Sequence, residues 1–363
     1  MAERLFLVGV LTKYDEKWEK IDSLDELASL GRTAGGEVVE KILQRRDKID
    51  PRFFIGKGKA EELTRIAGEL EIDTFVFDEE LSGVQIRNLE SLTGRKVIDR
   101  TELILDIFAK HAKTGTSKIE VELTQLQYRL SRLTGKGIAL SRLGGGIGTR
   151  GPGETKLEVD RRRIRNRIRS FKMILKSIEM SKEIQSKRRG NFFRVAIIGY
   201  TNAGKSTVMN QLTHSNLVVE DKLFSTLDAT TRILADSTGK KILVTDTIGF
   251  LRKLPHGLIS SFKSTLQEAI EADLRLHVID ISHPHCELQL SAGNEILELL
   301  GVVGRPTLYV FNKIDKDSSL IPILQRKYWD AVFISALKGN KLTELKERIF
   351  SFVKNPTPTK GEI

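Results

Sequence analysis

The chain of 363 residues contains one cysteine, Cys286, and lacks any long hydrophobic run. One cysteine excludes an internal disulfide and is typical of a protein kept in a reducing compartment. No stretch of about 18 uncharged apolar residues is present, so the sequence predicts no transmembrane helix. Residues 1–20 hold a short apolar stretch, but charges follow at once and no cleavage site of small residues is evident. We therefore expect a cytoplasmic protein that is not secreted, with peripheral membrane attachment as the alternative.

Acidic residues are scarce in one segment. Residues 156–189 carry 13 Lys and Arg but only 4 Asp and Glu, whereas the whole chain has 59 against 48 and a net charge of +11. Most of the excess positive charge is therefore local, which favours a polyanionic partner over simple solubility. Attachment to a membrane surface is the weaker reading, because the basic residues surround the expected helix instead of lining one face.

Composition otherwise resembles that of an ordinary soluble protein. Hydrophobic residues make up 40% of the chain, and its length is sufficient for two or three domains, each with a core. Residues 1–100 alternate short apolar runs with helical patterns, which predicts a small α/β domain. The expected strands are 4–12, 37–46 and 73–80, and the expected helices are 23–35, 59–70 and 84–94, the last ended by Gly94.

Residues 101–190 carry helical periodicity instead. Apolar residues recur at steps of three and four in two stretches, at Ile119, Leu123, Leu126, Leu130 and Leu133, and again at Ile164, Ile168, Phe171, Leu175 and Ile178. Two such seams joined by one segment predict an antiparallel helical hairpin. Two amphipathic helices packed on separate domains are the alternative.

The connector between these helices, residues 134–156, holds eight glycines, four basic residues and one acid. Glycine-dense sequence cannot build a core, so a flexible linker is one interpretation. The basic residues spaced among the glycines favour a second interpretation, in which they contact RNA phosphates. No aromatic residue is interleaved here, so base stacking is not expected. The candidate RNA-binding residues in and after the connector are Arg142, Arg150, Lys156, Arg161, Arg162 and Arg165.

Residues 191–354 form a second α/β region, and residues 355–363 are predicted to be a disordered tail. The expected strands of the α/β region 191–354 are continuous apolar runs, as in a mostly parallel sheet covered by helices on both faces. They lie at 193–199, 241–247, 274–280, 306–312 and 331–335, and a last helix is expected at about 341–353.

The first of these strands leads into GYTNAGKST, residues 199–207, which fits the phosphate-binding pattern G-x-x-x-x-G-K-[ST]. Glycines permit a tight loop whose backbone N–H groups face phosphates, and the following helix adds its positive end. Lys205 supplies a charge for the terminal phosphates, and Ser206 a hydroxyl for Mg²⁺. The expected nucleotide-binding residues of this loop are Gly199, Tyr200, Thr201, Asn202, Ala203, Gly204, Lys205, Ser206 and Thr207.

Three further motifs follow strands. In DTIG, Asp246 is expected to hold Mg²⁺ through water and Gly249 to donate its N–H to a γ-phosphate. In NKID, the Asp315 carboxylate matches the two N–H donors of guanine that adenine lacks. The pocket is completed by Asn312 and Lys313, and by SAL, in which the Ala336 N–H would reach the guanine oxygen. The expected nucleotide-binding residues of the last two motifs are Asn312, Lys313, Asp315, Ser335, Ala336 and Leu337.

With these motifs the chain resembles the translation-factor class of P-loop GTPases and, from about residue 5 to 353, the HflX family of ribosome-associated GTPases. The segments that carry the resemblance are 54–63, 101–133, 141–168, 223–232 and 246–250. The resemblance implies GTP hydrolysis, binding to the large ribosomal subunit and its rRNA, and separation of idle or stalled ribosomes under stress. It also implies a Mg²⁺ threonine in LFSTLDATTR, for which we choose Thr226, with Thr230 and Thr231 as alternatives. ATP binding by the N-terminal region is known for some members.

Hydrolysis would use Lys205, Thr226 and Gly249. Phe250 stands where Ras-like proteins carry a water-orienting glutamine, so slow intrinsic turnover and an external activator are expected. Asn202 matches a position that coordinates K⁺ in several related GTPases; simple capping of the loop is the alternative. We expect a monomer that binds GTP and GDP. An rRNA-binding assembly or remodelling factor that uses the nucleotide only as an occupancy signal is the competing function.

Overall fold

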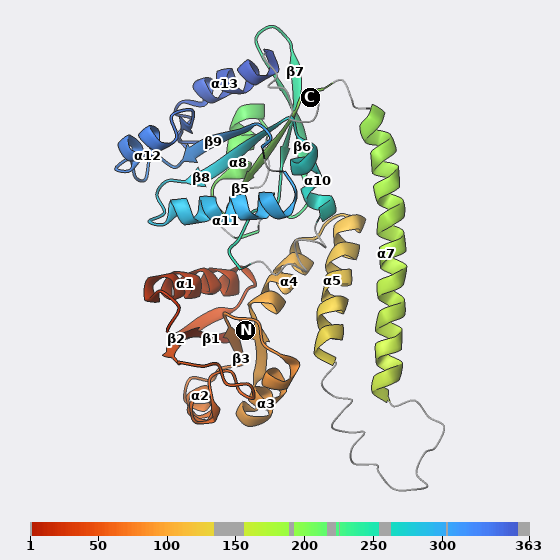
Figure 1. Ribbon diagram of the computed structural model, residues 1–363, viewed down its shortest axis with the longest axis vertical. Coiled ribbons are helices and arrows are strands. Elements are labelled where there is room, and N and C mark those ends of the chain that lie inside the picture. The colour runs from red at the N-terminus through yellow and green to blue at the C-terminus, as the bar shows by residue number, and fades with distance from the viewer. Residues whose placement is uncertain are drawn as a thin grey trace. The chain divides into compact units, whose positions relative to one another are not determined.

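The computed structural model describes residues 2–133, 156–188, 192–215, 223–224, 226–253, 263–302 and 304–354. The chain separates into two compact units (Figure 1). Unit 1 comprises residues 1–110 and 118–176, and unit 2 comprises residues 111–117 and 177–363. Within the described residues, no helix is both long enough and apolar enough to cross a membrane.

Unit 1 is built on a four-stranded parallel sheet of order β2-β1-β3-β4. Its central strands are covered on both faces, which explains why β1 is buried at every inner position. Phe6 packs edge-on against Phe75 at a centroid distance of 5.5 Å and belongs to the core beneath α2 and α3. The strands are β1 (Arg4–Leu11), β2 (Glu37–Arg45), β3 (Thr74–Phe77) and β4 (Lys96–Asp99). The helices around them are α1 (Lys17–Thr33), α2 (Lys57–Glu69), α3 (Gly83–Thr93) and α4 (Arg100–His111).

Helix α1 begins earlier than predicted. The sequence suggested a start at Ser23, but the helix begins at Lys17. Ser23 does not act as an N-cap: its hydroxyl is buried and donates to Asp78 over 2.7 Å, in a cluster with Arg100. The predicted stop at Gly94 of α3 is correct, and that glycine adopts φ = 64°.

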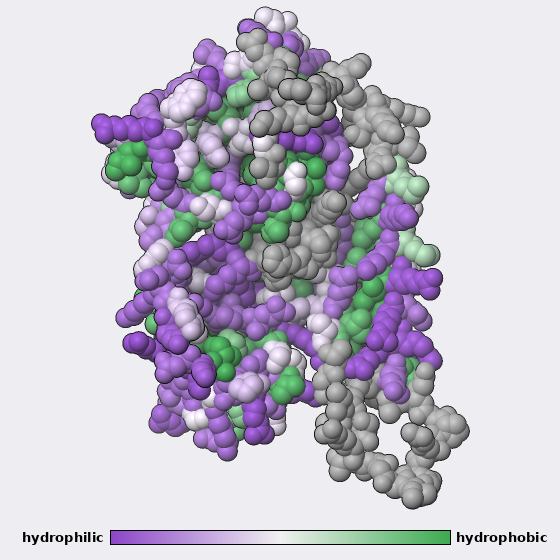
Figure 2. Space-filling model, viewed as in Figure 1, coloured by the Kyte–Doolittle hydropathy of each residue, from purple (hydrophilic) through white to green (hydrophobic). Residues whose placement is uncertain are grey.

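The two long helices predicted for residues 101–190 are α5 (Gly115–Leu133) and α7 (Lys156–Arg188). They run antiparallel: Arg161 near the start of α7 donates to Leu133 O at the end of α5 over 2.7 Å, and Arg167, further along α7, pairs at 3.4 Å with Glu122, which lies earlier in α5. The expected seam is only half-buried, with Leu123 and Phe171 as its fully buried members. Figure 2 shows a row of hydrophobic residues along α7 with hydrophilic residues on either side.

Unit 2 contains a six-stranded sheet of order β10-β9-β8-β5-β7-β6. All its neighbours are parallel except β6 and β7, which pair antiparallel at one edge, so the prediction of a mostly parallel sheet is confirmed. Its strands are β5 (Arg194–Gly199), β6 (Thr230–Ala235), β7 (Lys241–Asp246), β8 (Leu274–Asp280), β9 (Thr307–Asn312) and β10 (Val332–Phe333). Its helices are α8 (Lys205–Thr213), α10 (Lys263–Glu271), α11 (Cys286–Leu299), α12 (Ile321–Lys327) and α13 (Leu342–Lys354).

This topology places the polar motifs together. Strands β5, β7, β8 and β9 are parallel neighbours, so their carboxyl ends meet at one edge of the sheet. The phosphate loop follows β5, Asp246 ends β7, and Asn312 ends β9. That edge, next to the central strands, is where open α/β sheets bind their ligands.

Candidate functional site

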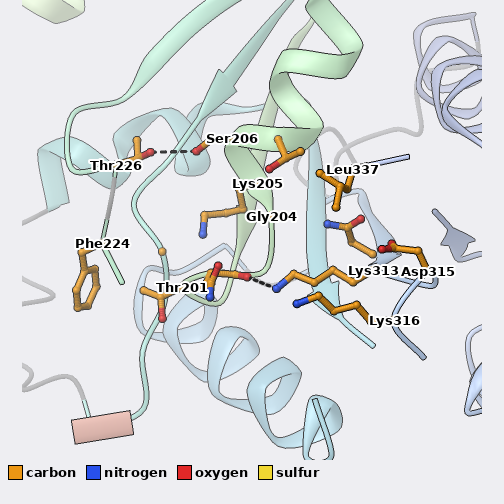
Figure 3. A pocket seen from close by; sticks show the side chains of 14 residues that line it. Thr201, Gly204, Lys205, Ser206, Phe224, Thr226, Lys313, Asp315, Lys316 and Leu337 are labelled. Atoms are coloured by element: carbon orange, nitrogen blue, oxygen red, sulfur yellow. Dashed lines mark hydrogen bonds between the residues drawn. The ribbon is translucent and has the colours of Figure 1, made fainter. Parts of the chain in front are cut away.

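The loop after β5 is shaped by two glycines. Gly199 has φ = 144°, and a Cβ on it would lie 2.1 Å from Val278 O. Gly204 has φ = 92°, and its Cβ would lie 2.3 Å from Nδ2 of Asn312. Neither position tolerates a side chain, so the backbone approaches β8 and β9 closely. The loop therefore forms a narrow cradle at the start of α8 (Figure 3).

Lys205 points into this cradle and is 7% exposed. Its ammonium group donates to Tyr200 O over 2.8 Å, within the loop. Burial lowers the pKa of Lys205 to about 8, although the nearby Asp246 carboxylate opposes the shift. A buried cation with so little compensation is suited to an anionic ligand such as a phosphate.

Three oxygen donors meet beside Lys205. The Ser206 hydroxyl donates to Asp246 Oδ2 over 2.6 Å and lies 3.1 Å from the Thr226 hydroxyl. The Thr226 hydroxyl lies 3.4 Å from the same carboxylate oxygen. Burial raises the pKa of Asp246, against the pull of Lys205, and its other oxygen is buried with no hydrogen-bond partner among the described residues.

This donor set fits Mg²⁺, which prefers hard oxygen ligands and is commonly held by one or two protein groups together with substrate phosphates. The orphaned buried oxygen of Asp246 is the kind of atom that a bound cation or its water would satisfy. The alternative threonines lie elsewhere: Thr230 and Thr231 begin β6, and the Thr231 hydroxyl contacts that of Thr245 at 2.9 Å.

On the other side of the cradle, Asn312 connects two loops. Its Nδ2 donates to Ala203 O over 2.9 Å, and its Oδ1 accepts from the Ala336 N–H over 3.0 Å. Lys313 donates to Asn202 O over 2.7 Å and pairs with Asp280 at 2.6 Å. Asn312 thus links the phosphate loop and the SAL segment through two buried hydrogen bonds, and Lys313 adds an exposed one to the phosphate loop.

The carboxylate expected to bind a base lies at the open end of this pocket. Asp315 Oδ1 accepts from the Ser335 hydroxyl over 2.5 Å, and this bond is the main reason that the pKa of Asp315 is lowered. Leu337, 74% exposed, stands beside it and offers an apolar surface for a planar ring.

Together these residues line a cavity of about 270 Å³. It brings together residues from the phosphate loop, the Thr226 segment, Gly249 and the NKID and SAL segments. The lining residues are Thr201, Asn202, Gly204, Lys205, Ser206, Thr207, Phe224, Thr226, Gly249, Asn312, Lys313, Asp315, Lys316 and Leu337. Gly199, Tyr200, Ala203, Asp246, Ser335 and Ala336 lie behind the lining.

Some site residues were not predicted. Asp280 ends β8, directly beside Asn312 in the sheet register, and fixes Lys313; its place after an apolar strand was the available signal. Phe224 is buried and lines the pocket, and its neighbour Thr226 was found only through the motif. Phe250 is also buried, and its ring meets His277 edge-on at 6.3 Å instead of lining the cavity.

The predicted RNA-binding residues are only partly described. Arg142 and Arg150, with the glycine-rich connector, lie outside the described residues, as does the tail 355–363. Lys156 begins α7, Arg161 is half-buried, and Arg162 and Arg165 are exposed on the same helix.

Three family models match successive parts of the chain. They are described as GTP-binding GTPase N-terminal (residues 21–109), GTP-binding GTPase Middle Region (111–189) and 50S ribosome-binding GTPase (194–313). The chain is 47% identical over 349 residues to GTPase HflX of Caldanaerobacter subterraneus subsp. tengcongensis, covering 96% of this chain and 80% of that protein. It is 40% identical to GTPase HflX of Escherichia coli K12, covering 95% and 81%.

A solved structure is also similar over almost the whole chain. The crystal structure of SsGBP in complex with GDP has a TM-score of 0.53 and 26% identity, and the match covers 98% of this chain and 99% of that one. The family models place an N-terminal region before a GTPase region, and the structural match to a GDP complex covers both.

Proposed function

The chain belongs to the HflX family of GTPases, and from that premise we propose that it binds the large ribosomal subunit and separates idle or stalled ribosomes. The observation that carries the proposal is the combination of a buried lysine, a three-oxygen cation site and a guanine-type carboxylate in one cavity. Relatives carry the same family name over nearly the full chain, and one matched model is described as ribosome-binding. We infer that the chain acts in the cytoplasm as a monomer.

In this proposal GTP lies with its phosphates in the cradle and its base against Asp315 and Leu337. The N–H groups of the loop and the Lys205 ammonium group bind the phosphates, and Gly249 N–H faces the γ-phosphate. Ser206 and Thr226, with Asp246 through a water, would hold Mg²⁺, which would supply positive charge beside the phosphate oxygens. Lys205 and Gly249 hold the γ-phosphate while water attacks it in line.

Phe250 gives the site no group to orient that water, which supports slow turnover until an activator completes the site. We propose the ribosome as that activator. Asn202, held at φ = 60° in the loop, is a candidate ligand for K⁺. Potassium would then supply positive charge that no arginine among the described lining residues provides.

The basic helix α7 supports contact with rRNA. Its exposed arginines include Arg162 and Arg165, and few acidic residues lie near them in the sequence of the helix. We propose that these side chains, Arg161, Lys156 and the connector arginines Arg142 and Arg150 bind phosphates of rRNA. We also propose that the chain is divided into an N-terminal α/β domain (residues 1–100), a helical hairpin (101–190) and a GTPase domain (191–354).

The experiment is a sedimentation assay of idle ribosomes with the full chain and either a non-hydrolysable GTP analogue or GDP. We expect subunits to separate with the analogue and to stay joined with GDP. A matched pair of variants is Ser206→Ala, which removes a cation ligand, and Ser181→Ala, which removes an exposed hydroxyl of α7 that donates to Ser177 O. Separation that is independent of nucleotide, or that survives Ser206→Ala, would contradict the proposal.

The competing function, an rRNA-binding assembly or remodelling factor, is favoured by the charge of α7 alone. It predicts equal binding of isolated rRNA in every nucleotide state and no separation of ribosomes. The same assay with added rRNA therefore distinguishes the two functions.

A further inference from the structure

Asp228, two residues beyond the Thr226 hydroxyl, makes a contact that the nucleotide site itself does not require. Its carboxylate binds the loop between α4 and α5 (residues 112–114). Oδ2 accepts from the backbone N–H groups of Lys113 over 2.9 Å and Thr114 over 3.2 Å, and Oδ1 accepts from the Thr114 hydroxyl over 2.7 Å. The Asp228 carboxylate therefore accepts three hydrogen bonds from residues 113 and 114.

The contact also organises the start of α5. The Thr114 hydroxyl, which donates to Asp228, accepts from the Ser117 N–H over 3.1 Å. This is the N-cap of the helix, which satisfies one of the backbone donors left open in its first turn. Asp228 thus sets the direction of the hydroxyl that caps α5.

The opposite end of the same short segment reaches the cation site. Thr226 lies 3.1 Å from the Ser206 hydroxyl, and Leu227 between the two contacts is only 2% exposed. Two residue steps span at most about 7 Å. Strand β6 then begins at Thr230, in register with Asp246. The segment from Thr226 to Thr230 is therefore short and held at both ends. A displacement of Thr226 must move Asp228 or strain the backbone between them.

The division of the chain into two units is consistent with a role of Asp228 in coupling the nucleotide pocket to α5. Residues 111–117 belong to unit 2 with the nucleotide pocket, whereas the flanking residues 1–110 and 118–176 belong to unit 1. The Asp228 contact thus lies within unit 2, and the helix that it caps continues covalently into unit 1.

We propose that Asp228 is a positioning residue that transmits the nucleotide state from Thr226 to the N-terminal turn of α5. The inference rests on the proposed function, in which GTP with Mg²⁺ holds Thr226 inward. With GTP bound, the Asp228 carboxylate holds the cap of α5; with GDP bound, Thr226 is released and the cap loosens. The reverse holds as well, because coupling between two sites is reciprocal: a firmly capped α5 favours GTP over GDP.

The test is amide hydrogen exchange of the full chain with Mg²⁺ and either a non-hydrolysable GTP analogue or GDP. We expect the peptide covering residues 111–118 to exchange about tenfold more slowly with the analogue, a typical size for coupling between sites. In Asp228→Ala this difference disappears, and the ratio of analogue to GDP affinity falls by about the same factor. Thr114→Val behaves like Asp228→Ala, and Thr114→Ser, which keeps the hydroxyl, behaves like the parent chain.

The matched control is Asp236→Ala. Asp236 follows the other end of β6 and accepts the same number of bonds, from the Thr238 hydroxyl (2.7 Å), Thr238 N–H (2.9 Å) and Lys240 N–H (2.8 Å). In Asp236→Ala, the amide exchange of residues 111–118 should still differ between the analogue and GDP as in the parent chain. Equal exchange of that peptide in both states of the parent chain, while residues 199–207 are protected by nucleotide, overturns the coupling alone. Absence of nucleotide protection at residues 199–207 overturns both the coupling and the proposed function.

Discussion

Asn312 is the side chain whose removal tests the architecture of the pocket most sharply. It is 2% exposed and connects the phosphate loop to the SAL segment through Ala203 O and Ala336 N–H. Asn312→Ala leaves both backbone groups buried without a partner, at a cost of about 1–3 kcal/mol for each group. In the free variant the two loops can part and both groups can reach water, so nucleotide binding must bury them again. The smaller figure for both groups is about 2 kcal/mol, which then corresponds to about a 30-fold change in the dissociation constant.

We therefore expect Asn312→Ala to weaken GDP binding by about 30-fold or more, measured by calorimetric titration of the full chain. Asn312→Asp keeps the acceptor for Ala336 and loses the donor for Ala203, so its loss should be intermediate. The matched control is Asn88→Ala in unit 1, where Nδ2 makes one exposed hydrogen bond to Arg52 O at 2.8 Å. A dissociation constant for Asn312→Ala within threefold of the parent value, in a chain with unchanged urea stability, would refute this reasoning.

Three further predictions concern single groups. Gly204→Ala should prevent GDP binding, because φ = 92° disfavours a side chain and the added Cβ would meet Asn312 Nδ2 at 2.3 Å; retained affinity in a titration would contradict this. The pKa of Lys205 is about 8 in the free site, so GDP binding at pH 8 should raise this pKa and the protein should take up protons. The uptake is measured as a binding enthalpy that depends on the buffer, and Lys205→Met should show none. Burial, together with the charge of Lys205, lowers the pKa of His277 to about 4 from 6.5, so the unfolded chain binds more protons between these values. Stability should fall by roughly 3 kcal/mol as pH drops from 6.5 to 4, and urea titrations of His277→Leu should show a flatter profile.

Much of unit 2 could be predicted because its signals are local. A glycine pair, a lysine and two hydroxyls after an apolar strand specify a phosphate loop within nine residues, and the structure places Gly204, Lys205, Ser206 and Thr207 around one cavity. The carboxyl-end positions of Asp246 and Asn312 follow from the rule that parallel strands end at one edge. The predicted P-loop fold and the GTPase assignment are confirmed by the family matches.

Other features depend on residues far apart in sequence and gave no local signal. Ser23 was expected to begin a helix, but its hydroxyl bonds to Asp78, 55 residues away, and the helix begins at Lys17. The apolar steps of α5 and α7 predicted a buried seam, whereas most of its members are half-exposed and α5 also buries Ser117, Glu120 and Thr124. The antiparallel strand β6 was missed because its sequence TTRILA mixes exposed polar and apolar residues, as suits a sheet edge.

The most direct test of the central claim is GTP turnover by the purified chain, with and without large ribosomal subunits, in potassium and in sodium buffer. The account predicts slow turnover alone and strong stimulation by subunits, abolished by Ser206→Ala. Turnover that is unchanged by subunits in either buffer would contradict the claim that this guanine-nucleotide pocket is completed by, and acts on, the ribosome.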